Sequence, residues 1–270
     1  MTKPVYVSCI IQVNVDDSFV SESPYLHAFD GLVTVHHQMA KQEFGEEQME
    51  YINYIKLMKR QIKTLDSRER AYQDNVIRPF LQSVFGDLDI EPVDIKINSE
   101  IHQYEQYCGT YEKKYKDEKT NNEIIKLLPA TPDLCITDEW HWNNLEVLVN
   151  YRGVVEIKSP ILDYITGFAP SEYKCLTEIK RHLKAKNNAK VILTDGVTWV
   201  FYNKESDLEP IIKPICLGEL KYRYSVSKNN RRILARTKGR KPIIDDIIFQ
   251  EDEDEFIRLK EELKNFITPM

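Results

Sequence analysis

The amino-acid sequence predicts an α/β fold in which helices flank a mixed central sheet. Between residues 67 and 203, helical and strand-like patterns follow in the order helix, strand, strand, strand, helix, strand, strand. Such interleaving is typical of a layered α/β domain. Hydrophobic residues make up 42% of the 270-residue chain and charged residues 30%, which is the composition of a folded globular protein.

The first quarter of the chain, residues 1–65, is predicted to be an N-terminal accessory segment. Residues 4–15 alternate between two faces, as a half-buried strand does. A helix is expected over residues 46–64, where apolar side chains recur at helical intervals. These side chains are Ile52, Ile55, Ile62 and Leu65.

The next helix is predicted to begin at Ser67, a favourable N-cap residue, and to stop before Gly86. Pro79 lies inside it and is expected to kink or split it. Its apolar side chains have the i, i+3, i+4 spacing of one buried face: Ile77, Phe80, Leu81, Val84 and Phe85. Extended backwards, this spacing places Glu69 and Gln73 on the same buried face.

The middle of the chain contains several predicted strands and one more helix. Strands are expected within residues 89–101, 132–137 and 145–158, and a hairpin within 189–203 turns at Asp195 and Gly196. A helix capped by Ser171 extends to about residue 185, with Lys174, Glu178, Arg181 and Lys184 on its outer face. Residues 105–126 are predicted to be a polar insertion. Nearby tyrosines are spaced as a helical stripe: Tyr104, Tyr107, Tyr111 and Tyr115.

The C-terminal part, residues 216–270, combines a basic segment with a predicted helix. Residues 221–241 hold nine basic side chains, interleaved with tyrosines, and no acidic one. We expect this segment to bind phosphates through Lys221, Arg223, Arg231, Arg232, Arg236, Lys238 and Arg240. The alternative is a surface loop balanced by nearby acidic residues, such as the run at 251–255. A helix over 251–267 has one apolar stripe, suited to docking on the body or on a second copy.

Asp133, Glu156 and Lys158 form the candidate site. Side chains alternate along a strand, so Glu156 and Lys158 project from one face, while Val155 and Ile157 project into the core. If the strands predicted within residues 132–137 and 145–158 are neighbours, the Asp133 carboxylate converges with that of Glu156. Two carboxylates this close repel unless a hard divalent cation such as Mg²⁺ joins them. Taken alone, the opposite charges on this strand would fit a solvated face equally well.

These residues carry a resemblance to a known family. "PD" at 132–133 and "EIK" at 156–158, with the surrounding order of elements, resemble the PD-(D/E)xK nuclease superfamily over roughly residues 67–203. The resemblance implies a restriction-endonuclease-like core over residues 66–215 and DNA cleavage dependent on Mg²⁺, with Mn²⁺ as a substitute. It implies Asp133 and Glu156 as metal ligands and Lys158 as the catalytic lysine.

Some members of that superfamily place a glutamate in the first core helix, and Glu69 is the matching residue here. It is therefore a third candidate metal ligand. The alternative is that Glu69 caps its helix or pairs with Arg68 or Arg70 on the surface.

The expected function is that of a metal-dependent endonuclease of a restriction-modification or other antiviral defence system, with DNA as its partner. Duplex cleavage would need a homodimer or two successive nicks. One alternative is a catalytically silent nuclease-like module for DNA binding or assembly, and another is a structural adaptor unrelated to nucleic acid. The net charge of −6 argues against binding by bulk charge alone.

The sequence also predicts the cellular setting. No apolar run approaches the ~20 residues of a membrane helix, and the N-terminus lacks the pattern of a signal peptide. A cytoplasmic protein without membrane association is therefore expected. The five cysteines are scattered without a CxxC pair, which favours reduced thiols over zinc binding or disulfides.

Overall fold

The computed structural model describes residues 49–93, 110–116, 123–140, 150–160, 172–185, 187–227, 229–236 and 242–268. The chain divides into two units, Met1–Gly45 and Glu46–Met270, and every described element belongs to the second. The predictions for residues 4–15, Tyr104, Tyr107, Lys238 and Arg240 fall outside the described residues.

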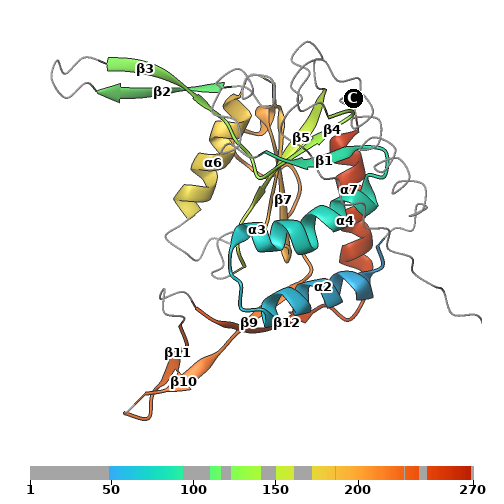
Figure 1. Cartoon of the computed structure of the whole chain (residues 1–270), viewed down its shortest axis with the longest axis vertical. Coiled ribbons are helices and arrows are strands. Elements are labelled where there is room, and N and C mark those ends of the chain that lie inside the picture. The colour runs from blue at the N-terminus through green and yellow to red at the C-terminus, as the bar shows by residue number, and fades with distance from the viewer. Residues whose placement is uncertain are drawn as a thin grey trace, which may run out of the picture. The chain divides into compact units, whose positions relative to one another are not determined.

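A mixed six-stranded sheet forms the centre of the described unit (Figure 1). Its strands are ordered β1-β4-β5-β6-β7-β8. Strands β5 and β6 are parallel, and the other neighbouring pairs are antiparallel. The bounds are Asp89–Pro92 for β1, Leu134–Thr137 for β4, Tyr151–Ile157 for β5, Lys190–Thr194 for β6, Thr198–Asn203 for β7 and Ile215–Cys216 for β8. The predicted α/β class with a mixed sheet is confirmed.

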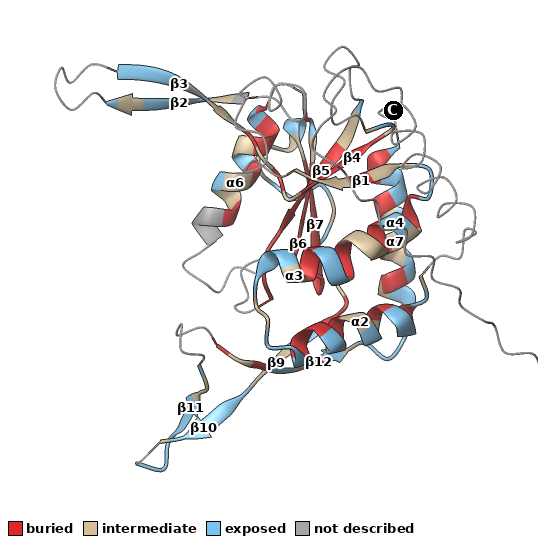
Figure 2. Ribbon diagram, in the orientation of Figure 1, coloured by how far each residue is buried: buried red, intermediate tan, exposed pale blue. Residues whose placement is uncertain are grey.

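Helices cover both faces of this sheet, because alternate side chains of its strands enter two different cores. Helix α6, Glu172–Lys184, connects β5 to the parallel β6 and covers one face. There Cys175, Ile179 and Leu183 pack with Val154 and Val191. The opposite face packs into a larger core with helices α2 (Tyr51–Lys63), α4 (Arg78–Val84) and α7 (Asp254–Ile267) (Figure 2). This core receives Val155, Ile157, Ile192, Trp199 and Phe201 from the strands.

Helix α2, Tyr51–Lys63, is part of the larger core. Its buried apolar side chains are Tyr51, Tyr54, Met58 and the predicted Ile62. Ile52 and Leu65, also expected on the buried face, are 50% and 58% exposed. The tyrosine rings bury more apolar area than the isoleucine does. Tyr54 Oη also donates a hydrogen bond to Gly196 O at 2.5 Å, which fixes the helix on the β6–β7 turn. The helix assigned above to an accessory segment therefore packs with the main body.

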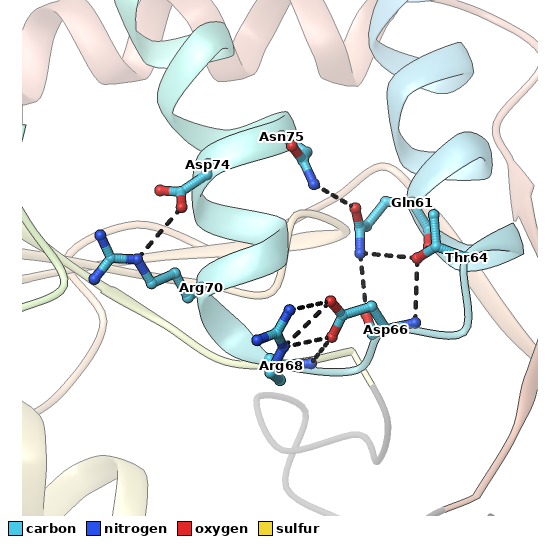
Figure 3. A network of polar contacts seen from close by, with 7 residues as sticks. All are labelled: Gln61, Thr64, Asp66, Arg68, Arg70, Asp74 and Asn75. Atoms are coloured by element: carbon cyan, nitrogen blue, oxygen red, sulfur yellow. Dashed lines mark hydrogen bonds and ion pairs between the residues drawn. The ribbon is translucent and has the colours of Figure 1, made fainter.

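A polar network forms the turn between α2 and the next helix (Figure 3). Asn75 Nδ2 donates to Gln61 Oε1 at 2.8 Å, and Gln61 Nε2 donates to the backbone oxygen of Asp66 at 3.0 Å. The Arg68 guanidinium pairs with the Asp66 carboxylate, and these hydrogen bonds lower the pKa of Asp66 to about 2. The network sets the position at which the following helix begins.

That helix is continuous but changes its winding. It consists of α3, Glu69–Tyr72, the π-helical turn η1, Gln73–Ile77, and α4, Arg78–Val84. Arg68 is the N-cap residue, so the helix begins slightly later than the Ser67 cap predicted. Pro79, which has no backbone N–H, lies at the start of α4, so the interruption expected there takes the form of a change to π-helical winding directly upstream.

The π-helical turn also changes which side chains of this helix are buried. The apolar set from Ile77 to Phe85 is buried as predicted. Gln73 is buried too, but Glu69 is exposed, so its predicted place on the buried face is wrong. The turn accounts for this difference because a wider turn rotates the residues before it relative to those after it.

Residues 110–116 and 123–129 form two paired strands where a polar insertion with a helical tyrosine stripe was expected. Strand β2, Thr110–Lys116, pairs antiparallel with β3, Glu123–Pro129. Tyr111 and Tyr115 are four residues apart, a spacing that places two side chains on one face of a helix or of a strand. Because both residues lie on strand β2, the predicted helical stripe is wrong for Tyr111 and Tyr115.

The C-terminal part consists of short strands and one long helix. Helix α7, Asp254–Ile267, buries Phe256, Leu259, Leu263 and Phe266 against the body, as one of the two predicted options has it. Strands β9, Gly218–Tyr222, and β12, Ile244–Phe249, pair antiparallel, as do β10, Tyr224–Val226, and β11, Arg232–Leu234. None of the described helices has the length and apolar character needed to cross a membrane. Cys135, Cys175 and Cys216 do not form disulfides.

Candidate active site

Two antiparallel strands bring Asp133 next to Glu156. In the register of β4 and β5, Leu134 lies opposite Val155. Asp133, one residue before β4, donates its backbone N–H to Val155 O at 3.1 Å. Its Oδ2 accepts a hydrogen bond from the backbone N–H of Ile157 at 2.6 Å. These two bonds hold the Asp133 carboxylate at the end of β5, beside Glu156.

Glu156 and Lys158 are buried side chains at the end of β5. Each residue is only 7% exposed, which rules out the solvated-face interpretation. Lys158 N donates to Thr194 O at 2.8 Å and so continues the contact with the parallel strand β6. The Lys158 ammonium and a Glu156 carboxylate oxygen form an ion pair. As predicted, these side chains lie on the face opposite Val155 and Ile157.

Helix α6 contributes two further residues that the sequence analysis did not assign to the site. Glu178 Oε2 lies 2.8 Å from Lys158 Nζ, so the ammonium is held between two carboxylates. His182 Nε2 lies 2.8 Å from Glu156 Oε2. The outer face predicted for Glu178 is therefore wrong. Glu178 and His182 are four residues apart, on the side of α6 that carries Cys175 and Ile179. This spacing is the sequence signal that could have identified both residues.

The electrostatic environment of the site shifts the pKa values of Asp133 and Glu156 in opposite directions. Burial, and then the charge of Glu156, raise the pKa of Asp133 to about 8. Burial would also raise the pKa of Glu156, but the hydrogen bond with His182 and the charge of Lys158 lower it below its ordinary value. Burial would lower the pKa of Lys158, but the Glu156 charge and hydrogen bonds with Glu156 and Glu178 raise it. At neutral pH Lys158 is therefore a cation.

Glu69 is close enough to this group to act on it electrostatically. It is the first residue of α3 and is exposed, and its charge raises the pKa of both Asp133 and Lys158. The surface pairs suggested as an alternative do not form as ion pairs of Glu69, because Arg68 pairs with Asp66 and Arg70 with Asp74. Glu69 therefore acts on the site through its charge.

The donor set suits a hard cation, although no ligand cluster is assembled. Among the described residues, no group of three or more His, Cys, Asp or Glu side chains is placed to hold a metal ion. Lys158 and His182 occupy the two oxygens of Glu156. However, burial and the Glu156 charge raise the pKa of Asp133 despite the nearby Lys158 charge, so a further cation beside this carboxylate would favour its ionised form. Ser159 Oγ and His182 Nδ1 are buried without a hydrogen-bond partner in the described part of the chain.

The basic segment lies on the β9–β12 pair and the β10–β11 hairpin. Lys221, Arg231 and Arg236 are exposed. Within the protein, Arg223 forms an ion pair with Asp245 at 2.9 Å, and Arg232 lies over the Tyr224 ring at 4.0 Å. The predicted balance by nearby acidic residues thus applies to part of this segment.

Comparison with known proteins gave no match. No family model, no curated protein sequence and no solved structure is significantly similar to this chain.

Proposed function

We propose that this chain is a metal-dependent nuclease that hydrolyses phosphodiester bonds in DNA, built on a restriction-endonuclease-like core of the PD-(D/E)xK type. One observation carries the proposal. Asp133 and Glu156 lie side by side on adjacent strands with Lys158 alongside, and burial together with mutual repulsion holds the pKa of Asp133 at about 8. Such strong perturbation is typical of functional sites.

Lys158 serves as a fixed positive charge in this proposal. Its raised pKa makes it a poor general base, so it does not take a proton from the attacking water. As an ammonium it donates hydrogen bonds, and it stabilises negative charge that develops on the phosphate. Glu178 orients it, because the Glu178 carboxylate holds the ammonium from the side of α6.

Asp133, Glu156 and Glu69 are the residues that would hold Mg²⁺ or Mn²⁺. A divalent cation there would polarise the scissile phosphate and lower the pKa of a bound water. A cation beside Asp133 would favour loss of its proton, because burial and the Glu156 charge are what raise its pKa. His182 orients the Glu156 carboxylate through its 2.8 Å contact. An endonuclease of a defence system, acting as a homodimer or by successive nicks, remains the biological setting we propose.

A second candidate function is a catalytically silent module of the same architecture that binds DNA. The observation that favours it is the occupation of both Glu156 oxygens by Lys158 and His182. A carboxylate committed to two internal partners is a structural ion-pair network in many proteins. In this alternative the exposed cations of the basic segment carry the affinity.

Incubation of the purified chain with circular plasmid DNA, in Mg²⁺, in Mn²⁺ or in EDTA, tests the proposal. A nuclease gives nicked or linear DNA only with metal, and Glu156→Gln and Lys158→Ala abolish cleavage while DNA binding persists. A silent module binds the plasmid with salt-dependent affinity and leaves it intact under all three conditions. An adaptor unrelated to nucleic acid would show neither property.

A further inference from the structure

The β2–β3 hairpin has two chemically different faces. Directly opposed residues share a face, so the register pairs Lys113 with Lys126 and Tyr115 with Ile124 on one side. Tyr111 belongs to the same side because side chains alternate along the strand. We call Tyr111, Lys113, Tyr115 and Lys126 the aromatic-basic face.

Both described carboxylates of the hairpin lie on its other face. Glu112 alternates with the tyrosines of β2, and Glu123 pairs in register with Lys116. On that second face, Lys114 Nζ lies 3.3 Å from a Glu123 oxygen. The second face is thus neutralised by its own carboxylates, whereas no carboxylate of the described residues forms an ion pair with Lys113 or Lys126.

The aromatic-basic face brings like charges together. The ammonium groups of Lys113 and Lys126 lie 4.8 and 5.3 Å from the centre of the same Tyr115 ring. Like charges directly opposite one another on neighbouring strands destabilise a sheet. An anion bound between the two lysines would relieve this repulsion, and the flat tyrosine ring beside them suits a nucleotide.

This face leads towards the candidate active site through α6. The Arg181 guanidinium lies over the Tyr111 ring, 5.8 Å from its centre. On α6, Arg181 comes directly before His182, which contacts Glu156. It comes three residues after Glu178, which forms an ion pair with Lys158. Figure 1 shows the hairpin extending beyond α6. A chain of phosphates bound along the hairpin could therefore continue into the site.

We propose that the aromatic-basic face and Arg181 bind the phosphate backbone of DNA beside the cleavage site. This inference rests on the proposed nuclease function and gives the substrate a second contact besides the basic segment at 221–241. Lys113, Lys126 and Arg181 supply the positive charge, and the Tyr115 ring contacts both lysine ammonium groups.

The test is binding of fluorescein-labelled duplex DNA, followed by fluorescence anisotropy in EDTA so that no cleavage occurs. Lys113→Ala/Lys126→Ala removes two cations from the aromatic-basic face. The matched control, Lys114→Ala/Lys116→Ala, removes the same charge from the opposite face. We expect the first variant to bind at least about 10-fold more weakly, with a log K versus log[salt] slope smaller by about 2 over ~50–200 mM salt. The control should differ little from wild type.

The outcomes separate this inference from the proposed function. Equal affinities and slopes for the two double variants would overturn the inference, while metal-dependent cleavage by the wild type would leave the nuclease proposal standing. Selective loss of binding in the first variant, with no cleavage by the wild type in any metal, would support the face and overturn the nuclease. A wild type that binds no DNA overturns both. Circular dichroism of each variant establishes that the fold is intact.

Discussion

The ionised form of Asp133, which the proposed function requires, destabilises the folded protein. Its pKa is raised from 3.8 to about 8, so the folded state holds this proton more tightly than the unfolded state does. The free energy of unfolding should therefore fall as pH rises from about 4 to about 8. Asp133→Asn keeps an oxygen that accepts the Ile157 N–H but cannot ionise. At pH 8, without metal, we expect this variant to be more stable than wild type by at least about 1.4 kcal/mol, the equivalent of one pKa unit.

Urea denaturation between pH 4 and pH 9 in EDTA measures this difference. The control is Asp87→Asn, which removes an exposed carboxyl from the turn after α4 and should follow the wild-type pH profile. The raised pKa of Asp133 would be contradicted if the wild-type stability did not fall between pH 4 and pH 8. It would also be contradicted if Asp133→Asn were less stable than wild type at pH 8.

Lys158 allows the structural and chemical roles of one residue to be separated. Lys158→Met leaves Glu156 and Glu178 without their shared cation, and breaking a buried pair in this way typically costs about 3–5 kcal/mol. Adding Glu178→Gln removes one of the two stranded carboxylates, so the double variant should recover part of that loss. Cleavage should stay absent in both variants, because Lys158 supplies the charge that faces the phosphate.

Chemical denaturation and the plasmid assay, run on the same four proteins, test this expectation. The fourth protein is Glu178→Gln alone, which should retain some cleavage because Lys158 is present but held only by Glu156. Additive losses of stability in the double variant would show that Glu178 and Lys158 do not interact energetically. Recovery of cleavage in the double variant would exclude a catalytic role for Lys158.

Among the secondary-structure elements, the β6–β7 turn shows how α2 is fixed to the sheet. Gly196 has φ 85°, and a Cβ there would lie 2.9 Å from Met58 Sδ. Gly196→Ala should therefore destabilise the fold by roughly 1–3 kcal/mol, through backbone strain and through displacement of Met58. Gly86→Ala is the matched control, since a Cβ at Gly86 meets no atom within 4 Å. Thermal denaturation compares them, and equal melting temperatures would contradict this packing.

The elements that follow from local sequence patterns were predictable. Strand β5 alternates between core and site side chains, α7 carries one continuous apolar stripe, and the Asp195–Gly196 turn closes a hairpin. Each of these patterns has one periodicity along its whole length, so the choice between helix and strand and the buried face follow directly. The proximity of Asp133 to Glu156 followed from the same alternation once two strands were assumed to be neighbours.

Features that depend on tertiary contacts were not predictable in this way. The tyrosine spacing in residues 104–115 suits a helix, yet Tyr111 and Tyr115 lie on a strand whose partner is β3. Glu69 was placed on the wrong face because a π-helical turn cannot be read from apolar spacing. Glu178 looked like one more charged residue on an outer face, and only the packing of α6 over β5 reveals its contact with Lys158.

For the whole molecule, the proposed cation site predicts that metal binding and folding are linked. A ligand that binds only the folded state stabilises it by RT ln(1 + [L]/Kd), about 1.4 kcal/mol at a concentration tenfold above Kd. Mg²⁺ or Mn²⁺ should therefore raise the melting temperature of the wild type. The increase should be larger at pH 8 than at pH 5, because the ion competes with a proton on Asp133, whose pKa is about 8. Asp133→Asn and Glu156→Gln should lose most of it.

Differential scanning calorimetry with added chloride salts tests this linkage, with Ca²⁺ as a further hard cation and Asp87→Asn as the variant that keeps the full shift. The expected pattern is an increase in wild type and Asp87→Asn that is absent from the two site variants. No increase with any divalent cation, in a chain that still binds DNA, would favour the silent module, in which Glu156 stays paired with Lys158 and His182. An equal increase in melting temperature for all four proteins would mean that the ion binds elsewhere on the surface. The linkage would then no longer support a cation site at Asp133 and Glu156.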